Sequence, residues 1–335
     1  GTAYDIFGTH KKLYVYSEGN FFDATPQRST ADLTSVFTTV NASSLVTITH
    51  SSHGATEGDY VTVSSTNAAT AGISAAIMDG EYEIESITDT NTYVIDVGTN
   101  ATSAVSTTNN CTVTYEITAG RDRALSGYGW GTGTWDSSNT WDSPNTSDSV
   151  TIGLRSWNLD NWGEDVIALD IDAGIYNWDT SGGISTASNV ASAITNAPTK
   201  TKFMIVSNPD RHLICFGTET TIGTTSTQDP MFIRWSDQDD FNSWTATATN
   251  SAGSQRVTGG SKIVTAVSTR GQILFLTDTS AHGMSFIGAP FTFGFQKLGT
   301  NCGAVSPHCA VDISGIIYWM SSDGFYMFDG TVRKM

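Results

Sequence analysis

The sequence predicts an all-β protein: a β-propeller with a small β-barrel domain inserted into one of its loops. An apolar strand, a tight turn and a second, aromatic strand recur along the 335 residues. Only 15% of the residues are charged, while Gly, Ser and Thr are abundant, which is typical of an all-β protein with many turns. Residues 36–117 alternate polar and apolar side chains in a pattern of their own.

The recurring unit is a β-hairpin. It reads LYVYSEGNFFDAT from Leu13, VIALDIDAGIYNWDT from Val166, ILFLTDTSAHGMSFIG from Ile273 and IIYWMSSDGFYMFDG from Ile316, with a split copy from Leu213 (LICFG) to Met231 (MFIRWSD). A hairpin of this kind cannot bury its apolar face alone, so several copies indicate a radial or stacked β-repeat. We therefore expect several propeller blades and little helix.

A change of character marks the second domain. No Lys or Arg lies between Arg28 and Arg121, and five short alternating runs are separated by turns. Such runs suffice for a small closed barrel. We expect residues 1–35 to be the first part of the propeller, 36–117 an inserted small β-domain and 118–335 the remainder. Because Gly1 falls within a predicted strand, the chain is interpreted as a fragment of a longer protein.

Tryptophans and small residues distinguish the segments that follow. Six of the nine tryptophans lie between residues 130 and 178, where they either fill gaps between blades or form a carbohydrate platform. Since they flank predicted strands rather than one loop tip, we expect Trp157, Trp162 and Trp178, with Leu159, to be mostly structural. The segment 184–200 has small residues at roughly helical spacing, which indicates a helix or loop between blades.

The charge balance excludes one class of function. Sixteen basic and 33 acidic residues give 16 − 33 = −17, with a pI near 4.5. Binding to nucleic acid by phosphate neutralisation needs clustered Lys and Arg, and none is present. An acidic surface suits either plain solubility or a wall along which DNA slides without sticking.

No motif predicts catalysis. The six histidines form no HExxH, no Ser lies in GxSxG, and no phosphate-binding loop occurs. Two acidic groups offer paired carboxylates for a glycosidase, but they fall at predicted turns, where carboxylates bond nearby backbone N–H groups. These groups are Asp165, Asp170 and Asp172, and Asp237, Asp239 and Asp240.

Three neighbouring residues are of metal-binding types but do not predict a metal site. Cys302, His308 and Cys309 lie close in sequence, but no second ligand pair accompanies them, and Cys309 reads as a small buried hydrophobe in a strand. We therefore predict no catalytic, cofactor-binding or metal-binding residue, no enzymatic activity and no cofactor. No apolar run approaches the ~18 residues of a membrane span.

Several strings together carry a resemblance to a known family. They are TPQR from Thr25, GWGTGTW from Gly129, RSWNLDNWGEDVIA from Arg155, GIYNWD from Gly174, RWSDQDDFNSW from Arg234 and YWMSSDGFYMFDG from Tyr318. Over residues 1–28 and 118–335 the chain resembles the tail-hub or nozzle proteins of tailed bacteriophages and is similar to the packaged-DNA stabilisation proteins of short-tailed phages. The insert is similar in fold to the first catalytic-cysteine half-domain of ubiquitin-activating enzymes, without that chemistry.

The resemblance implies a structural virion protein. Its members are β-propeller subunits of a ring, commonly a hexamer, below the portal and adaptor, where they contact other tail proteins. Such a ring extends the DNA channel, helps retain the packaged genome until ejection, and is assembled in the host cytoplasm. DNA passes through it without specific binding. The alternative is a carbohydrate-binding or glycan-cleaving propeller of a tail receptor-binding apparatus.

Overall fold

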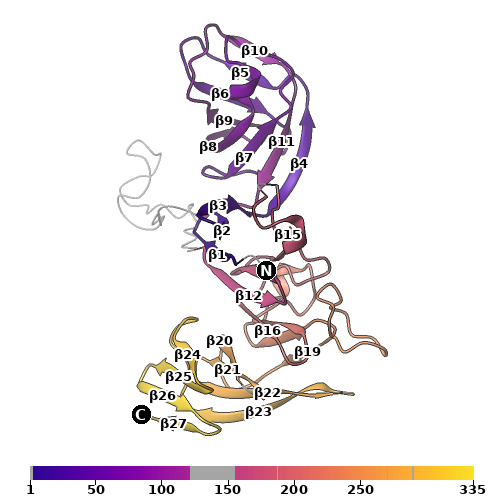
Figure 1. Cartoon of the computed structure of the whole chain (residues 1–335), viewed down its shortest axis with the longest axis vertical. Helices are drawn as coiled ribbons and strands as arrows, with labels where there is room; N and C mark the ends of the chain where they lie inside the picture. The colour runs from indigo at the N-terminus through magenta and orange to yellow at the C-terminus, as the bar shows by residue number, and fades with distance from the viewer. Residues whose placement is uncertain (1–2, 121–154, 187, 270, 289) are drawn as a thin grey trace, which may run out of the picture. The chain divides into compact units, whose positions relative to one another are not determined.

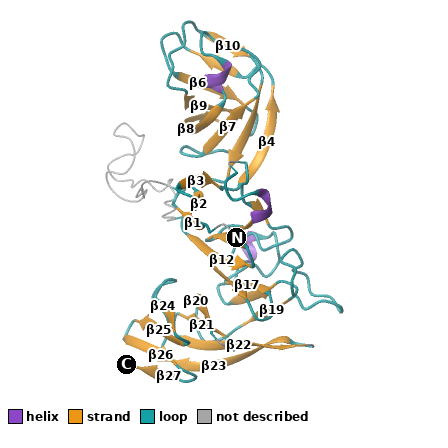
Figure 2. Ribbon diagram, in the orientation of Figure 1, coloured by secondary structure: helices purple, strands orange, loops and turns teal. Residues whose placement is uncertain are grey.

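The computed structural model is an all-β protein, which confirms the predicted fold class (Figures 1 and 2). It describes residues 3–120, 155–186, 188–269, 271–288 and 290–335. Strands hold 50% of the described residues and helices only 3%. The helices are α1 (Ala75–Met78) and the single 3₁₀ turns η1 (Thr180–Gly182) and η2 (Thr225–Thr227). None of these described helices has the length and apolarity that a membrane crossing requires.

The chain divides into two compact units, residues 1–156 and 157–335. The first unit opens with a three-stranded antiparallel sheet of β1 (Asp5–Gly8), β2 (Leu13–Ser17) and β3 (Asn20–Asp23). Its strands β2 and β3 are the hairpin predicted from Leu13, joined through Glu18 and Gly19, both of which have positive φ. Gly19 adopts this backbone without the steric cost that a Cβ imposes.

The rest of the first unit is an eight-stranded sheet in the order β10-β5-β6-β9-β8-β7-β11-β4. Its strands are β4 (Gln27–Leu33), β5 (Phe37–Thr39), β6 (Leu45–Thr49), β7 (Tyr60–Ser64), β8 (Gly80–Asp89), β9 (Thr92–Asp96), β10 (Val105–Thr108) and β11 (Cys111–Glu116). Along β5, β6, β7, β9 and β11 alternate side chains point into one core, around Phe37, Tyr93 and Tyr115. The five alternating runs predicted from the sequence are β6, β7, β8, β9 and β11, and the sheet also takes in β4, ahead of residue 36. The insertion boundaries at 36 and 117 stay a prediction.

A buried lysine joins the two sheets of the first unit. Lys12, just before β2, is 4% exposed, and its Nζ contacts the carboxylates of Asp23 (2.6 Å), Glu116 (3.1 Å) and Glu81. Burial disfavours the charged lysine, but hydrogen bonds to Asp23 and Glu81 and the charge of Glu116 outweigh it and raise the Lys12 pKa. We call these four residues the Lys12 cage.

The second unit repeats one plan four times. Each repeat is a four-stranded antiparallel sheet in sequential strand order, named here sheets I to IV. The strands are β12 (Trp157–Trp162), β13 (Asp165–Asp170), β14 (Ile175–Trp178) and β15 (Ser192–Ala193) in sheet I; β16 (Phe203–Ser207), β17 (His212–Phe216), β18 (Phe232–Trp235) and β19 (Gly253–Arg256) in sheet II; β20 (Ile263–Ser268), β21 (Ile273–Thr277), β22 (Ser280–Gly288) and β23 (Thr292–Thr300) in sheet III; and β24 (Ala310–Ile313), β25 (Ile316–Ser321), β26 (Gly324–Phe328) and β27 (Val332–Lys334) in sheet IV. The predicted hairpins are the second and third strands of these sheets.

Neighbouring sheets stack face to face. Along β17, Leu213 and Cys215 pack with sheet I, whereas Ile214 and Phe216 pack with sheet III. β21 repeats this arrangement between sheets II and IV. A strand covered on both faces reads as a continuous apolar run, and the five residues of β17 are all buried.

The first strands of successive sheets lie side by side, β12 next to β16, β16 next to β20 and β20 next to β24. Polar side chains reinforce the first of these contacts. Asn158 Oδ1 and Asp160 Oδ2 on β12 accept hydrogen bonds from the backbone N–H groups of Met204 and Val206 on β16, both at 2.7 Å. Sequential four-stranded antiparallel sheets are what a propeller predicts, and the propeller itself stays a prediction.

The segment 184–200 and the tryptophans were both singled out in the sequence of this unit. The segment 184–200 holds no helix in its described part; it runs as loop around the short strand β15, because its Ser and Asn side chains bond backbone groups locally, as Asn189 does with Asp179 and Gly183. Trp157, Trp162 and Trp178 are buried and Leu159 is partly buried. The Trp-rich segment 127–149 lies outside the described residues.

The Lys12 cage predicts a pH-dependent stability of the first unit. Burial, aided by Glu81 and Asp23, raises the pKa of Glu116 from 4.5 to about 8, since one ammonium cannot neutralise three carboxylates. Between these pKa values the folded state keeps a proton that the unfolded chain has lost. The free energy of unfolding should therefore fall as the pH rises through this window and level off, for this group, above it.

The variant Glu116→Gln keeps a neutral polar group in the cage and should flatten that dependence in urea titrations followed by circular dichroism. Asp32→Asn is the matched control, because Asp32 is exposed and accepts only from the Thr112 hydroxyl. A Glu116→Gln protein with the wild-type pH profile would contradict the assignment.

Candidate functional site

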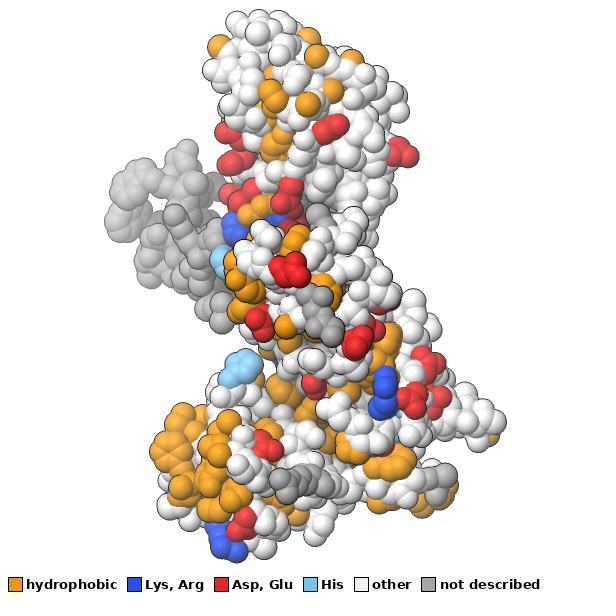
Figure 3. Space-filling view, in the orientation of Figure 1, with side chains coloured by type: hydrophobic (Ala, Val, Ile, Leu, Met, Phe, Trp, Pro, Cys, Tyr) orange, Lys and Arg blue, Asp and Glu red, His pale blue; other side chains and the backbone are white. Residues whose placement is uncertain are grey.

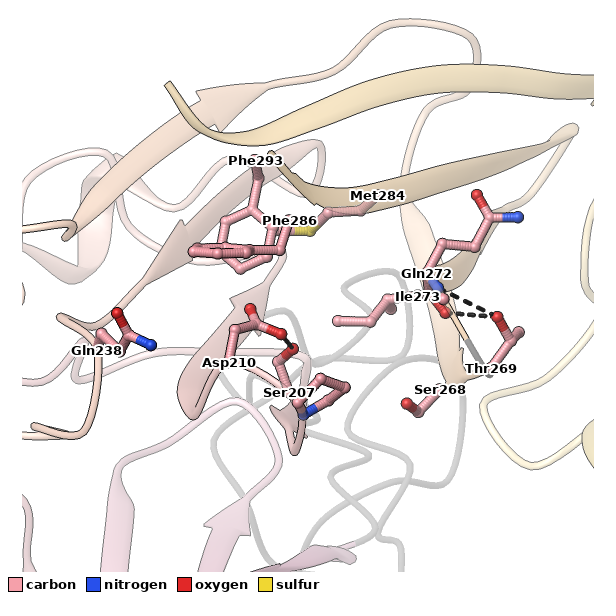
Figure 4. A pocket seen from close by; sticks show the side chains of 12 residues that line it. Ser207, Asp210, Gln238, Ser268, Thr269, Gln272, Ile273, Met284, Phe286 and Phe293 are labelled. Carbon is pink, nitrogen blue, oxygen red and sulfur yellow. Dashed lines mark hydrogen bonds between the residues drawn. The ribbon is translucent and has the colours of Figure 1, made fainter. Parts of the chain in front are cut away.

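A cavity of about 320 Å³ lies between sheets II and III (Figure 4). Its residues come from the β16–β17 turn, the segment after β18, the β20–β21 turn and the strands β21 to β23. The lining residues are Ser207, Pro209, Asp210, Gln238, Ser268, Thr269, Gly271, Gln272, Ile273, Met284, Phe286 and Phe293. The cavity is thus built by turns at one end of two stacked sheets, held in place by the apolar core beneath them.

Asp210 is the one charged side chain among these lining residues. It is 6% exposed, and its Oδ1 accepts a hydrogen bond of 2.6 Å from the Ser207 hydroxyl. Figure 4 shows Asp210 and Ser207 on the cavity floor, below the rings of Phe286 and Phe293. The second oxygen, Oδ2, is buried and accepts no hydrogen bond from the described part of the chain.

A histidine lies behind this carboxylate. His212 is fully buried, with its Nδ1 3.3 Å from Asp210 Oδ2, an approach that lacks hydrogen-bond alignment. The other ring nitrogen, Nε2, is 2.9 Å from Ser251 Oγ, and the ring packs against Phe286 and Phe293. Asp210, His212 and Ser251 thereby follow one another in the order carboxylate, imidazole and hydroxyl.

That order of groups resembles a hydrolase triad, but the hydroxyl is committed elsewhere. Ser251 Oγ is 2.7 Å from Asp237 Oδ1 and also accepts from the Gln238 N–H at 2.9 Å. Neither Ser251 nor His212 lines the cavity. A nucleophile has to reach its substrate, so the serine here fastens the 237–251 loop instead.

The remaining polar lining is available for a ligand. The side-chain amides of Gln238 and Gln272 and the hydroxyl of Ser268 make no hydrogen bond within the described chain. Opposite them Phe286 is 44% exposed, while Phe293 is buried beside it. The cavity therefore combines directional donors and acceptors with an apolar wall, which is the composition of a small-molecule site.

Five of the six acidic residues noted in the sequence bond backbone N–H groups, hydroxyls or basic side chains of the described chain. Asp165 Oδ1 accepts from the Thr180 N–H and hydroxyl, and Asp172 pairs with Lys202. Asp237 accepts from the Ser251 N–H (2.8 Å) and Asp240 from the Asn242 N–H (2.9 Å). None of these carboxylates lines the cavity.

The three residues weighed as metal ligands are not brought together. Cys302 lies in the core between sheets III and IV, His308 is exposed and Cys309 is half-buried. The described residues contain one group of close carboxylates, Asp23, Glu81 and Glu116, and the ammonium group of Lys12 contacts all three. Lys12 thus supplies the positive charge that a metal ion would bring to these ligands.

Sequence reasoning missed Asp210 and His212. The string SNPDRH is an ordinary turn signal, and its Asp is the type of residue that turns favour. What distinguishes Asp210 is its burial by Phe286 and Phe293, which lie more than 70 positions further along the chain. The one available signal was the pairing of Asp and His two residues apart, which places both on the same side of a strand end.

Comparisons with known proteins give little beyond the fold class. No family model matches the chain, and no curated protein matches it. Among solved structures the chain is similar to the phage phi92 endosialidase, with 12% identity and a TM-score of 0.24 over 97% of this chain. The chain spans 45% of that protein's length. A likeness this weak identifies no family and no activity.

The network around Asp237 predicts a stability effect without a catalytic one. Burial raises the Asp237 pKa, but hydrogen bonds from Ser251 and Gln238 lower it further, so the pKa lies below its ordinary value. Asp237→Ala should lower the free energy of unfolding by about 1–3 kcal/mol at neutral pH, because two N–H donors lose their acceptor. The difference should shrink as the pH falls through the Asp237 pKa and the wild-type carboxylate is protonated.

Urea denaturation at neutral and acidic pH measures both effects. Asp240→Ala is the control, because it removes an acceptor from a single exposed N–H and should change stability by less than about 0.5 kcal/mol. Equal losses in the two variants would contradict the anchoring role of Asp237.

Proposed function

We propose that the chain is a structural subunit of a bacteriophage tail, a nozzle or hub ring that extends the DNA channel and helps retain the packaged genome. The observation that carries this proposal is the exposed apolar face of sheet IV, a surface suited to contacts with other proteins. Four of the six strings that resemble tail-hub proteins fall on sheets I, II and IV; for example, RSWNLDNWGEDVIA spans β12 and β13, and YWMSSDGFYMFDG spans β25 and β26.

The uncovered face belongs to sheet IV. In β25, Ile317 and Trp319 are buried against sheet III, and the alternate residues point to the other side. Cross-strand register places further apolar residues on that side, and Figure 3 shows hydrophobic side chains gathered over this sheet. The face comprises Val311, Ile313, Ile316, Tyr318, Met320, Phe325 and Met327.

Four of these side chains are strongly exposed: Val311 52%, Ile313 56%, Met320 44% and Phe325 60%. Contiguous apolar patches on a protein surface mark contacts with other proteins. Sheets II and III bury the corresponding faces against a neighbouring sheet. In the proposed ring the exposed face of sheet IV packs against an adjoining part of the assembly, through a heterologous contact.

The charges support a conduit for DNA. The net charge is −17, and three arginines of the second unit are engaged within the chain: Arg211 pairs with Asp239, Arg256 with Asp229, and Arg234 donates to the carbonyls of Glu219 and Thr220. Phosphates meeting a carboxylate-lined wall are repelled rather than held. DNA can then pass without specific contacts having to be broken.

The further attributes follow from the same resemblance. We propose a hexameric ring in the virion, assembled in the host cytoplasm, next to the portal, adaptor and other tail proteins. We also propose that the chain is not an enzyme and needs no cofactor. In support, the Ser251 hydroxyl is bound to Asp237, and one carboxylate alone lines the cavity among the described residues.

The assembly proposal predicts the effect of charge on the sheet IV face. The double variant Ile313→Asp/Met320→Asp should remain folded, since both side chains are exposed, but should fail to associate because a desolvated carboxylate opposes docking. Mass photometry of the purified protein and incorporation into phage particles measure this loss. Val40→Asp is the matched control: Val40 is 64% exposed, outside this face.

A particle map decides the location. A ring of this chain coaxial with the DNA channel is the expected result. A position away from the DNA axis, or a channel lined mainly by Lys and Arg, would overturn the conduit role even if the fold stands.

A further inference from the structure

We propose that the apex of the β22–β23 hairpin inserts into the surface of a lipid bilayer. In the described chain this apex comprises residues 285–288, 290 and 291. Such a role is independent of the tail assignment, because the hairpin alone supports it. Three features do so: a group of exposed apolar side chains, a stretch of sequence without charge, and a base that holds the apex in place.

The apex exposes three large apolar side chains together. Phe286 is 44% exposed, Ile287 57% and Phe291 73%, and Phe291 is the most exposed large hydrophobic residue of the described chain. β22 and β23 have nine residues each, against two to six in the other strands of the second unit, and Figure 1 shows the hairpin extending beyond its neighbours to a tip. Single exposed apolar residues are ordinary, but three at one tip mark a surface for a protein or a membrane.

The sequence of the hairpin carries no charge along most of its length. No Asp, Glu, Lys or Arg lies between Asp278 and Lys297, and the segment 241–255, whose Ser251 is bonded to the hairpin, has none either. Charged side chains are costly to move from water into lipid, so their absence removes the main opposition to insertion. In a chain of net charge −17, this hairpin can therefore approach lipid without desolvating a charge of its own.

A rigid base keeps the apolar side chains exposed. The rings of Phe286 and Phe293 pack against His212, with ring centroids 5.7 and 5.1 Å from the imidazole, and the Thr292 hydroxyl donates to the Ser251 carbonyl at 3.0 Å. Phe293 and Thr292 are buried, so the hairpin is fixed where it leaves the sheets. An apex that is already ordered loses little conformational freedom when it inserts, and more of the free energy of apolar burial remains for binding.

The shape of the apex fits a fluid surface better than a protein surface. Stable contacts between proteins bury about 800 Å² on each partner, which takes about 20–30 residues, far more than one hairpin turn supplies. A bilayer has no fixed shape to match, so a narrow tip suffices. The turn also limits the depth: the Phe291 N–H bonds the Gly288 carbonyl at 3.2 Å, but other backbone groups of the turn need water or headgroups, so insertion stops at the level of the headgroups.

Flotation of the whole chain with phosphatidylcholine vesicles tests the proposal. At millimolar lipid we expect the protein to float with the vesicles in 0.15 M and in 1 M NaCl alike, because apolar burial does not depend on charge that salt can screen. Absence of flotation would overturn the proposal. So would binding that requires phosphatidylglycerol and disappears in 1 M NaCl, since that behaviour is electrostatic.

Variants assign lipid binding to the apex. Ile287→Ser/Phe291→Ser should remain folded by near-ultraviolet circular dichroism, since both side chains are exposed, and should lower the partition coefficient by at least about tenfold, because burying one large apolar side chain carries about that factor. The control is Ile313→Asp/Met320→Asp, which alters the other large apolar surface of the second unit and should bind lipid as wild type does.

The two pairs of substitutions also separate this role from assembly. The apex variant should associate with other subunits as wild type does, whereas the sheet IV variant should not. Lipid binding that is retained by the folded apex variant and lost in the sheet IV variant would place the lipid contact on sheet IV and overturn the proposal. An apex variant that loses subunit association but keeps its lipid binding would assign the apex to a protein partner, with the same consequence.

Discussion

The structure of the second unit depends on one constraint: each four-stranded sheet is apolar on faces that it cannot cover by itself. Residues alternate between the two sides of a strand, so an all-apolar strand such as β17 needs a neighbour on each side. Stacking supplies that neighbour, and burial of this kind is the main favourable contribution to folding. Sheets II and III satisfy the constraint within the chain, whereas sheet IV satisfies it on one face. Covering the second face takes a further sheet, either of the same protein or of a partner.

The same stacking leaves a cavity at one end of the strands. Strands of neighbouring sheets pack closely along their length, but the turns at their ends carry different residues and need not touch. Between the β16–β17 and β20–β21 turns the space is about 320 Å³, with Asp210 at its floor. The rigid sheets beneath hold these turns in position, which is why loops on such scaffolds so often carry binding residues.

The sequence predicts the elements that local residue patterns specify, but not those that depend on contacts between distant residues. The hairpins at Leu13, Val166, Ile273 and Ile316 were predictable, because apolar runs around a tight turn specify adjacent antiparallel strands. The outer strands β15 and β19 were not, because they are short or polar and are strands only through pairing with β14 and β18. The cavity could not be predicted from the sequence either. Asp210, Gln272 and Phe286 are ordinary residues of turns and strands, and only the stacked sheets bring them together.

In the first unit, the uneven distribution of Lys and Arg along the sequence determines which charged side chains pair in the structure. The absence of Lys and Arg between residues 28 and 121 leaves Arg28 as the one basic residue in the strands of the eight-stranded sheet, and Arg28 donates to the backbone carbonyls of His53 and Gly54. The turn before β2 supplies cations for the carboxylates of this sheet: Lys11 pairs with Glu83 at 2.8 Å, and Lys12 enters the cage with Glu81 and Glu116. A buried cation with several anionic partners adds little net stability, but removal of either side leaves an uncompensated charge. The three-stranded sheet and the eight-stranded sheet are therefore matched by charge, and a sheet lacking Lys11 and Lys12 could not replace the one that carries them.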